Sequence, residues 1–216
     1  MMRDQAVNFQ IIVFFFVLGL LPLIVTMTTS FTKFSIVLTL LRSALGVQQA
    51  PGNMAISALA PAATLVVMAP TVEKIGADLS FGDRIERGQF PDVTEVYQAV
   101  RGPLGEFMME HSRPSERAFL VTAAKRIDPA RDAQETDFSL LIPAFMISEI
   151  SSGFEAGFLL YMAFLIIDLV VANVLTAMGM VMLSPTTVST PLKLFVLVSV
   201  SGISKLMHGL IVSYAK

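Results

Sequence analysis

Apolar and polar positions divide the chain into two hydrophobic parts with a polar stretch between them. Residues 9–29 form a first uncharged run, long enough for the ~20 residues that a bilayer-spanning helix needs. The run exceeds the apolar region of a typical signal peptide, and no A-x-A-like cleavage site follows it, so we expect an uncleaved segment. Residues 54–70 form a second run, which contains Pro61 and would span a membrane only marginally.

Residues 30–46 show the pattern of an amphipathic helix, with polar positions on the face opposite an apolar stripe. The apolar stripe consists of Phe31, Phe34, Leu38, Leu41 and Leu45. This pattern predicts a helix that packs on protein rather than lying free in lipid. The Pro51-Gly52 pair that follows predicts a turn over residues 47–53.

The second hydrophobic part begins with residues 140–158 and continues to 183 with Asp168 inside an otherwise apolar run. A carboxylate at mid-span costs ~2.5–3.5 kcal/mol on insertion scales, so Asp168 should face protein or a water-filled space. A last run, residues 191–214, carries Lys193, Lys205 and His208. It would be an awkward lipid-exposed span and a reasonable helix lining an assembly.

The charges are concentrated between the two apolar parts. The 216 residues are 54% hydrophobic and 15% charged, with a mean hydropathy of +0.71, whereas soluble domains are about a quarter charged. Of the 17 acidic and 15 basic residues, 13 and 9 fall within residues 73–137. This polar insert should be helical, since residues 92–95 resemble a capping box and 115–127 read as a second helix. Gly102-Pro103 should kink or split the helix that contains it.

These features predict an all-α fold of membrane-protein-like helical hairpins, in three regions. Residues 1–70 and 140–216 are hydrophobic and helical, and residues 71–139 form the polar helical insert. With four spans, Lys33, Arg42 and Lys193 fall on one side of the membrane without acids. The positive-inside rule then places the insert outside the cytoplasm.

The composition excludes several classes of function. The chain has no cysteine, its two histidines are far apart, and its net charge is −2, so we expect no metal, no cofactor and no nucleic acid. No phosphate loop, HExxH or G-x-S-x-G motif occurs. Two alternatives stay open: a small-solute or ion channel or transporter that uses Asp168, and a membrane-embedded enzyme that uses Glu149, Glu155 or Asp168.

The sequence MGMVM at residues 178–182 places three methionines two apart at the end of the long apolar run. This spacing puts all three on one side only in an extended segment, and Gly179 and Pro185 both disfavour a helix. We therefore expect a loop or extended turn that presents flexible thioethers, the other interpretation being gap-filling residues at a helix end. The GxxxG pattern from Gly153 to Gly157 is a weaker signal of helix contact.

Three long segments closely resemble the FliP/SctR family, the core of the type III secretion export apparatus in flagella and virulence injectisomes. They are TSFTKFSIVLTLLRSALGVQQAPGNM (29–54), IPAFMISEISSGFEAGF (142–158) and FLIIDLVVANVLTAMGMVMLSPTTVSTPLKL (164–194). PLGEFMMEHSRPSE (103–116) is similar to the family's extracytoplasmic insert. The missing cleavable signal peptide and the segment VQQAPGNM favour the injectisome branch over the flagellar one.

The resemblance implies a pore-forming subunit of the export gate, not an enzyme, that conducts unfolded secreted proteins across the bacterial inner membrane. Five copies would form a helical ring in contact with membrane lipid, much of it on the periplasmic side. The implied partners are two smaller membrane subunits (S and T type), the autoprotease switch subunit (U type) and the large export-gate subunit (V type). A partner ATPase and the proton-motive force would supply the energy.

The resemblance also implies roles for particular residues. Met180, Val181 and Met182 would form a deformable gasket that closes the pore, although Val181 departs from the methionine that many members carry. The charges in the apolar parts would pair between neighbouring subunits rather than meet lipid. These inter-subunit candidates are Arg42, Glu149, Glu155, Asp168, Lys193 and Lys205.

Overall fold

A computed structural model describes residues 19–46, 53–79, 93–180 and 182–215 of the chain. All regular structure in these residues is helical, which confirms the prediction of an all-α fold. Of the turn expected at 47–53, residues 47–52 lie outside the described residues, and Asn53 is already the first residue of a helix. The first residue of the expected capping box (Asp92) and residues 9–18 of the first apolar run also lie outside the described residues.

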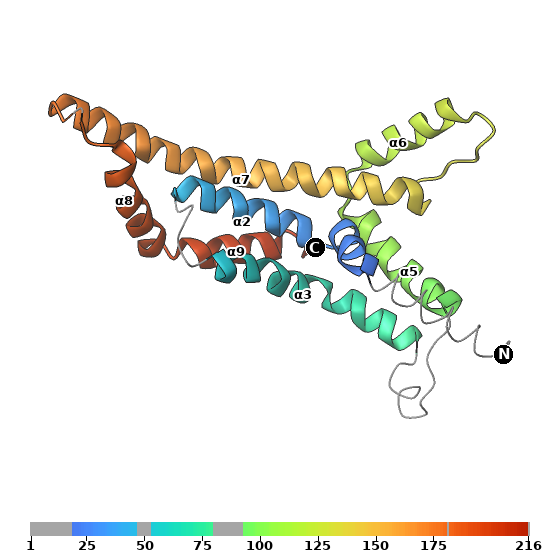
Figure 1. Cartoon of the computed structure of the whole chain (residues 1–216). Coiled ribbons are helices and arrows are strands. Elements are labelled where there is room, and N and C mark those ends of the chain that lie inside the picture. The colour runs from blue at the N-terminus through green and yellow to red at the C-terminus, as the bar shows by residue number, and fades with distance from the viewer. Residues whose placement is uncertain (1–18, 47–52, 80–92, 181, 216) are drawn as a thin grey trace, which may run out of the picture.

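The longest helix, α7 (Phe138–Ala177), runs along the whole molecule (Figure 1). The stretches 140–158 and 159–183 are therefore joined in one helix of 40 residues that ends at Ala177. At 1.5 Å per residue this helix is ~60 Å long, about twice the hydrocarbon thickness of a bilayer. Only part of α7 can lie in a membrane at once unless the helix is strongly tilted.

Helix α2 (Phe31–Leu45) packs along the middle of α7 and coincides with the predicted amphipathic helix. Two glycines on α7 permit a very close approach. A Cβ atom built on Gly157 would lie 2.4 Å from Leu40 Cδ1, and one on Gly153 would lie 3.3 Å from Ile36 Cβ. The GxxxG pattern therefore marks the place where these two helices touch.

Helix α3 (Asn53–Asp78) packs against α2 and, further along, against α5. It contains Pro61 and Pro70 and continues through residue 70 without interruption. The boundary expected between residues 70 and 71 thus falls inside a helix, and the division into three regions stays a prediction.

The polar insert contains α5 (Val93–His111) and α6 (Pro114–Ile127), which both pack against α7. Figure 1 shows them at the end of the molecule where α7 begins. Helix α6 confirms the second predicted helix of the insert. Helix α5 runs through Gly102 and Pro103 as one element, so these residues do not split it, and the other expectation, a kink, stays a prediction.

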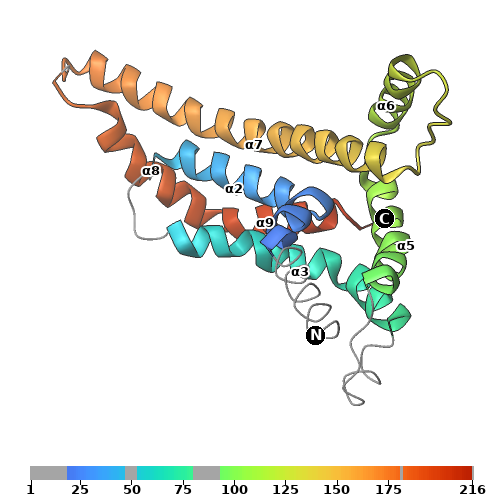
Figure 2. The same ribbon diagram turned by 45° about the vertical axis from the view of Figure 1, so that its right-hand side comes forward.

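Two sharp bends shape the rest of the chain. The helical segment Gly19–Thr28 meets α2 at 80°, and α8 (Pro185–Ser199) meets α9 (Gly202–Val212) at 60°. The single helix expected over residues 191–214 is therefore wrong. This stretch forms two helices, of which the first begins at Pro185. Figure 2 shows α8 folding back from the end of α7 and α9 returning beside α2 and α3.

Length and apolar composition suit two of the described helices to cross a membrane, the segment Ala58–Asp78 and α7. The number rises to four if each bent pair counts as one span. The chain therefore has the helices of a membrane protein, in an arrangement that is not a bundle of straight spans.

Candidate functional site

The methionine turn, residues 178–184, joins α7 to α8 at one extremity of the molecule (Figure 1). Gly179 has a φ of +72°, a left-handed conformation that glycine adopts without strain. The N–H of Gly179 donates to the carbonyl of Thr176, and that of Met180 donates to the carbonyl of Leu175. These are the two bonds of a Schellman motif, which ends α7 and satisfies its last carbonyl groups.

The side chains of this turn point largely into solvent. Met182 is 96% exposed, Met178 67% and Met180 42%. Val181, the third predicted gasket residue, lies outside the described residues. The loop expected from Gly179 and Pro185 is present, and it presents thioether side chains at the tip of the molecule, where they are available to neighbouring protein.

Helix α8 begins directly after the turn, with Ser184 at the N-cap position and Pro185 as its first residue. The fixed φ of proline suits this position, and its missing N–H costs nothing there. The hydroxyl groups of Ser184 and Thr186 lie 2.7 Å apart. The turn is therefore defined at both ends by residues that stop one helix and start the next.

An ion pair between the buried Lys193 and the half-buried Asp168 fixes α8 to the rest of the molecule. The ammonium of Lys193 donates to Asp168 Oδ2 at 2.6 Å and to the carbonyl oxygen of Ala44 at 2.8 Å. Ala44 lies in the last turn of α2, where a cation is favoured by the helix dipole and by unpaired carbonyls. The Lys193 side chain is only 5% exposed. Lys193 therefore ties α8 to both α7 and α2.

A second polar cluster lies where α2, α5 and α7 meet the residues after α9. The hydroxyl of Tyr214 donates to the buried carboxylate of Glu149. The ammonium of Lys33 donates to Ser213 Oγ at 2.9 Å and lies 4.3 Å from the centre of the Tyr214 ring. Burial and the neighbouring carboxylate of Glu149 raise the pKa of Tyr214 above its ordinary value, so this phenol stays a hydrogen-bond donor.

A third polar contact holds the insert on α7. The guanidinium of Arg113 donates to both carboxylate oxygens of Glu155 at 2.8 Å, and its backbone N–H donates to Ser148 Oγ at 2.8 Å. The hydrogen bond to Glu155 raises the pKa of Arg113. Both partners of this pair are well exposed, at 40% and 65%. The pair therefore contributes orientation more than stability.

The structure shows a partner in the same chain for Asp168, Lys193, Glu149 and Glu155. Asp168 pairs with Lys193, Glu149 accepts from Tyr214, and Glu155 accepts from Arg113. Arg42 lies near the end of α2 and Lys205 on the exposed side of α9. Contacts of these residues between subunits stay a prediction.

Sequence reasoning missed Tyr214 and Arg113. Tyr214 follows an apolar run, and Arg113 stands in a region where charges are common. Neither position carries a periodic or spaced signal, so only the folded chain brings them to their carboxylates.

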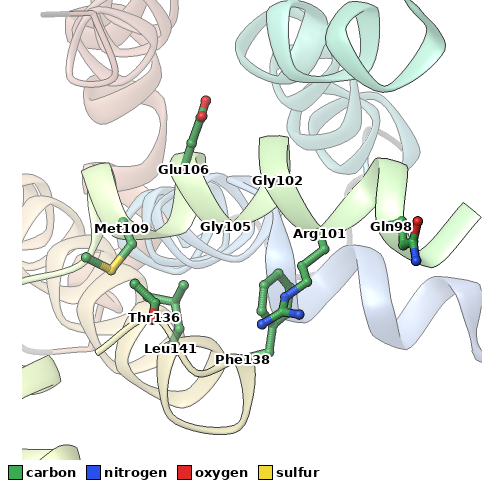
Figure 3. Close-up of a pocket in the computed structure, with 9 residues that line it drawn as sticks. All are labelled: Gln98, Arg101, Gly102, Gly105, Glu106, Met109, Thr136, Phe138 and Leu141. Carbon is green, nitrogen blue, oxygen red and sulfur yellow. The ribbon is translucent and has the colours of Figure 1, made fainter. Parts of the chain in front are cut away.

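A pocket of about 450 Å³ lies between α5 and the start of α7 (Figure 3). Its wall contains Arg101, Glu106, Met109 and Phe138 among other residues. Within the described part of the chain, no group of three or more His, Asp or Glu side chains is placed to hold a metal ion. The pocket adds no arrangement of groups that resembles a catalytic or cofactor site.

Comparisons with known proteins show which sequences this chain is similar to. A model of the FliP family matches residues 14–210. Yop proteins translocation protein R of Yersinia pestis is 42% identical over 208 residues, which covers 95% of each chain. Hypersensitivity response secretion protein HrcR of Ralstonia nicotianae is 39% identical over 97% of this chain and 99% of its own. Flagellar biosynthetic protein FliP of Caulobacter vibrioides is 43% identical over 93% of this chain and 74% of its own.

Proposed function

The chain belongs to the FliP family, and from this premise we propose that it is a pore-forming subunit of a type III secretion export gate. In this role it conducts unfolded secreted proteins across the bacterial inner membrane. The apolar helices and the secretion relatives support a membrane-embedded component of a secretion apparatus, which needs no catalytic site of its own.

The observation that carries the proposal is the methionine turn. Its thioethers stand exposed at a tip of the chain, between a helix end and a helix start that are both well defined. Methionine is flexible and polarizable, so a ring of such tips from several copies can close on itself and then yield around an extended polypeptide. A rigid aromatic side chain would fit fewer shapes. Met180, Val181 and Met182 are the gasket residues in this proposal.

The gate is an assembly in this proposal. Several copies of the chain, five by family resemblance, surround the pore together with the S-type and T-type subunits, and the U-type and V-type subunits dock on the complex. The polar insert lies on the periplasmic side. Relatives named for translocation and for the hypersensitivity response match the chain along nearly their whole length, which supports the injectisome branch.

The alternative role of Asp168 as an ion or proton site in a small-solute transporter has less support. Its carboxylate is engaged by a buried lysine, which in turn holds a backbone carbonyl. This arrangement is a structural tie between three helices. Purified chain that alone catalysed solute uptake in liposomes would favour the transporter.

The gasket is tested by replacing Met180 and Met182 together with glycine in cells that express the complete apparatus. We expect normal assembly and an increased ion leak through the complex, measured with a membrane-potential dye. The matched control is Met178→Gly, which removes an exposed thioether that precedes the gasket residues and should leave the seal intact. An unchanged leak in normally assembled complexes of the double variant would contradict the gasket role.

The branch is tested in a strain that lacks the gene, by scoring secreted virulence effectors and swimming motility side by side. Lost effector secretion with normal motility supports the injectisome. Lost motility with normal secretion would move the chain to the flagellar branch.

A further inference from the structure

His111 is the last residue of α5 and lies directly against the segment that follows α9. Its ring centre is 5.0 Å from that of Tyr214 and 4.5 Å from that of Phe107. The C mark in Figure 2 lies beside α5 in agreement with this contact. A titratable side chain therefore stands between the insert and the end of the second hydrophobic part.

Both ring nitrogens of His111 face backbone carbonyl oxygens. Nδ1 lies 2.8 Å from the oxygen of Phe107, and Nε2 lies 3.4 Å from the oxygen of Tyr214. A carbonyl oxygen only accepts hydrogen bonds, and neutral imidazole carries a single N–H. The neutral ring can therefore satisfy one of these contacts and must turn a lone pair toward the other oxygen. The imidazolium donates to both.

The charges around the ring also bear on its proton. The carboxylate of Glu149 on α7 attracts a positive charge at His111, and the position at the end of α5 favours a cation through the helix dipole. Lys33 on α2 lies on the Tyr214 ring and opposes it. The Tyr214 hydroxyl is engaged with Glu149. The two carbonyl contacts are the direct hydrogen-bonding partners of the ring.

We propose that His111 is a proton-responsive positioning residue, whose protonation fastens residues 213–215 to α5. Loss of the proton breaks the weaker contact, from Nε2 to the Tyr214 carbonyl, and loosens this segment. The response falls between about pH 5 and 8, the range in which histidine changes charge. The inference concerns the chain itself and does not depend on the proposed export role.

The test uses a nitroxide spin label at Ala215→Cys, an exposed position in a chain with no natural cysteine. The full chain is labelled once, purified in detergent, and its spectrum is recorded from pH 8 to pH 5. We expect the ratio of immobile to mobile label to rise about tenfold as the pH falls, the equivalent of one added charge-assisted hydrogen bond. A label at Phe119→Cys, exposed on α6, is the control and should show no change.

Two variants identify the titrating group. His111→Gln, whose amide takes up no proton in this range, should abolish the pH response, and Glu149→Gln should keep it. A pH-independent spectrum of the labelled Ala215→Cys chain would overturn the proposal, and this measurement needs no substitution at His111 or Glu149. An unchanged response in His111→Gln, or a response lost only in Glu149→Gln, would overturn it as well.

Discussion

The two halves of α7 belong to one continuous helix and have very different surroundings. In the first half the helix is covered by α2 and the insert, and its buried residues include Leu141, Phe145, Glu149 and Gly157. Beyond Gly157 only three residues are buried, namely Phe164, Val171 and Leu175. Large apolar side chains such as Leu159, Ile166, Leu169 and Val170 stay exposed there.

The difference separates a half that is complete within one chain from a half that needs something else. The covered half has close helix packing and polar groups that find partners nearby. The exposed half carries the methionine turn at its end. The ion pair between Asp168 and the buried Lys193 joins it to α8. Apolar surface of this extent is stable against lipid or further protein and unfavourable against water. Each half should therefore respond differently to the same kind of substitution.

The largest difference is expected for the two carboxylates that α7 offers to a cation in the same chain. Asp168→Asn leaves the buried ammonium of Lys193 with only the Ala44 carbonyl and an amide, so we expect a loss of about 3 kcal/mol in the free energy of unfolding. Glu155→Gln changes an exposed pair and should cost less than about 1 kcal/mol. The melting temperatures of the two variants, purified in the same detergent, measure the contrast.

A charge swap sharpens this test. Asp168→Lys combined with Lys193→Asp restores an ion pair on paper, yet places a carboxylate against the Ala44 carbonyl, which cannot donate to it. We expect the swap to remain as unstable as Asp168→Asn. Full recovery by the swap would show that α2 takes no part in holding α8.

A smaller effect is expected where the covered half relies on close packing. Gly157→Leu adds a side chain where even a Cβ would lie 2.4 Å from Leu40 Cδ1, so α2 must move away from α7. We expect a loss of about 2 kcal/mol, measured by thermal unfolding. In contrast, a Cβ added at Gly209 on α9 would meet no atom within 4 Å. Gly209→Leu should be neutral or stabilising, because leucine favours a helix more than glycine does. Equal losses at both sites would contradict the close contact.

The sequence predicted these two halves unequally. Periodicity in residues 30–46 gave the limits of α2 to within a residue. Within the charged stretch, the helix expected at 115–127 is α6. Within residues 138–177 only the GxxxG pattern from Gly153 to Gly157 pointed to the covered half, and it is a weak signal. The bend after α8 was also missed, because Ser201 and Gly202 are too few to mark a break in an apolar run. The methionine turn was expected from Gly179 and Pro185, whereas the partners Tyr214, Arg113 and Ala44 depend on contacts between distant segments.

The smallest expected effect concerns the bend that turns α8 into α9. Ser201 has a φ of 52°, the left-handed conformation that side chains disfavour, and Ser201 is exposed. The backbone N–H of Ser201 donates to the carbonyl of Val198, and its carbonyl accepts from the N–H of Lys205, so neither bond involves the side chain. The next residue, Gly202, is confined in a different way. A Cβ there would lie 2.7 Å from Leu197 Cδ1, so this position has no room for a side chain.

Ser201→Gly should therefore stabilise the chain by about 0.5 kcal/mol, since the relief of strain exceeds the entropy that glycine adds to the unfolded state. This amounts to a rise of about 1–2 °C in melting temperature. The same substitution in the regular helix of the covered half, Ser151→Gly, should cost about 0.5 kcal/mol, because glycine disfavours a helix. The opposite signs are the measurement. If both variants melt lower by the same amount, the backbone at Ser201 carries no strain, and the bend is as relaxed as the regular helix at Ser151.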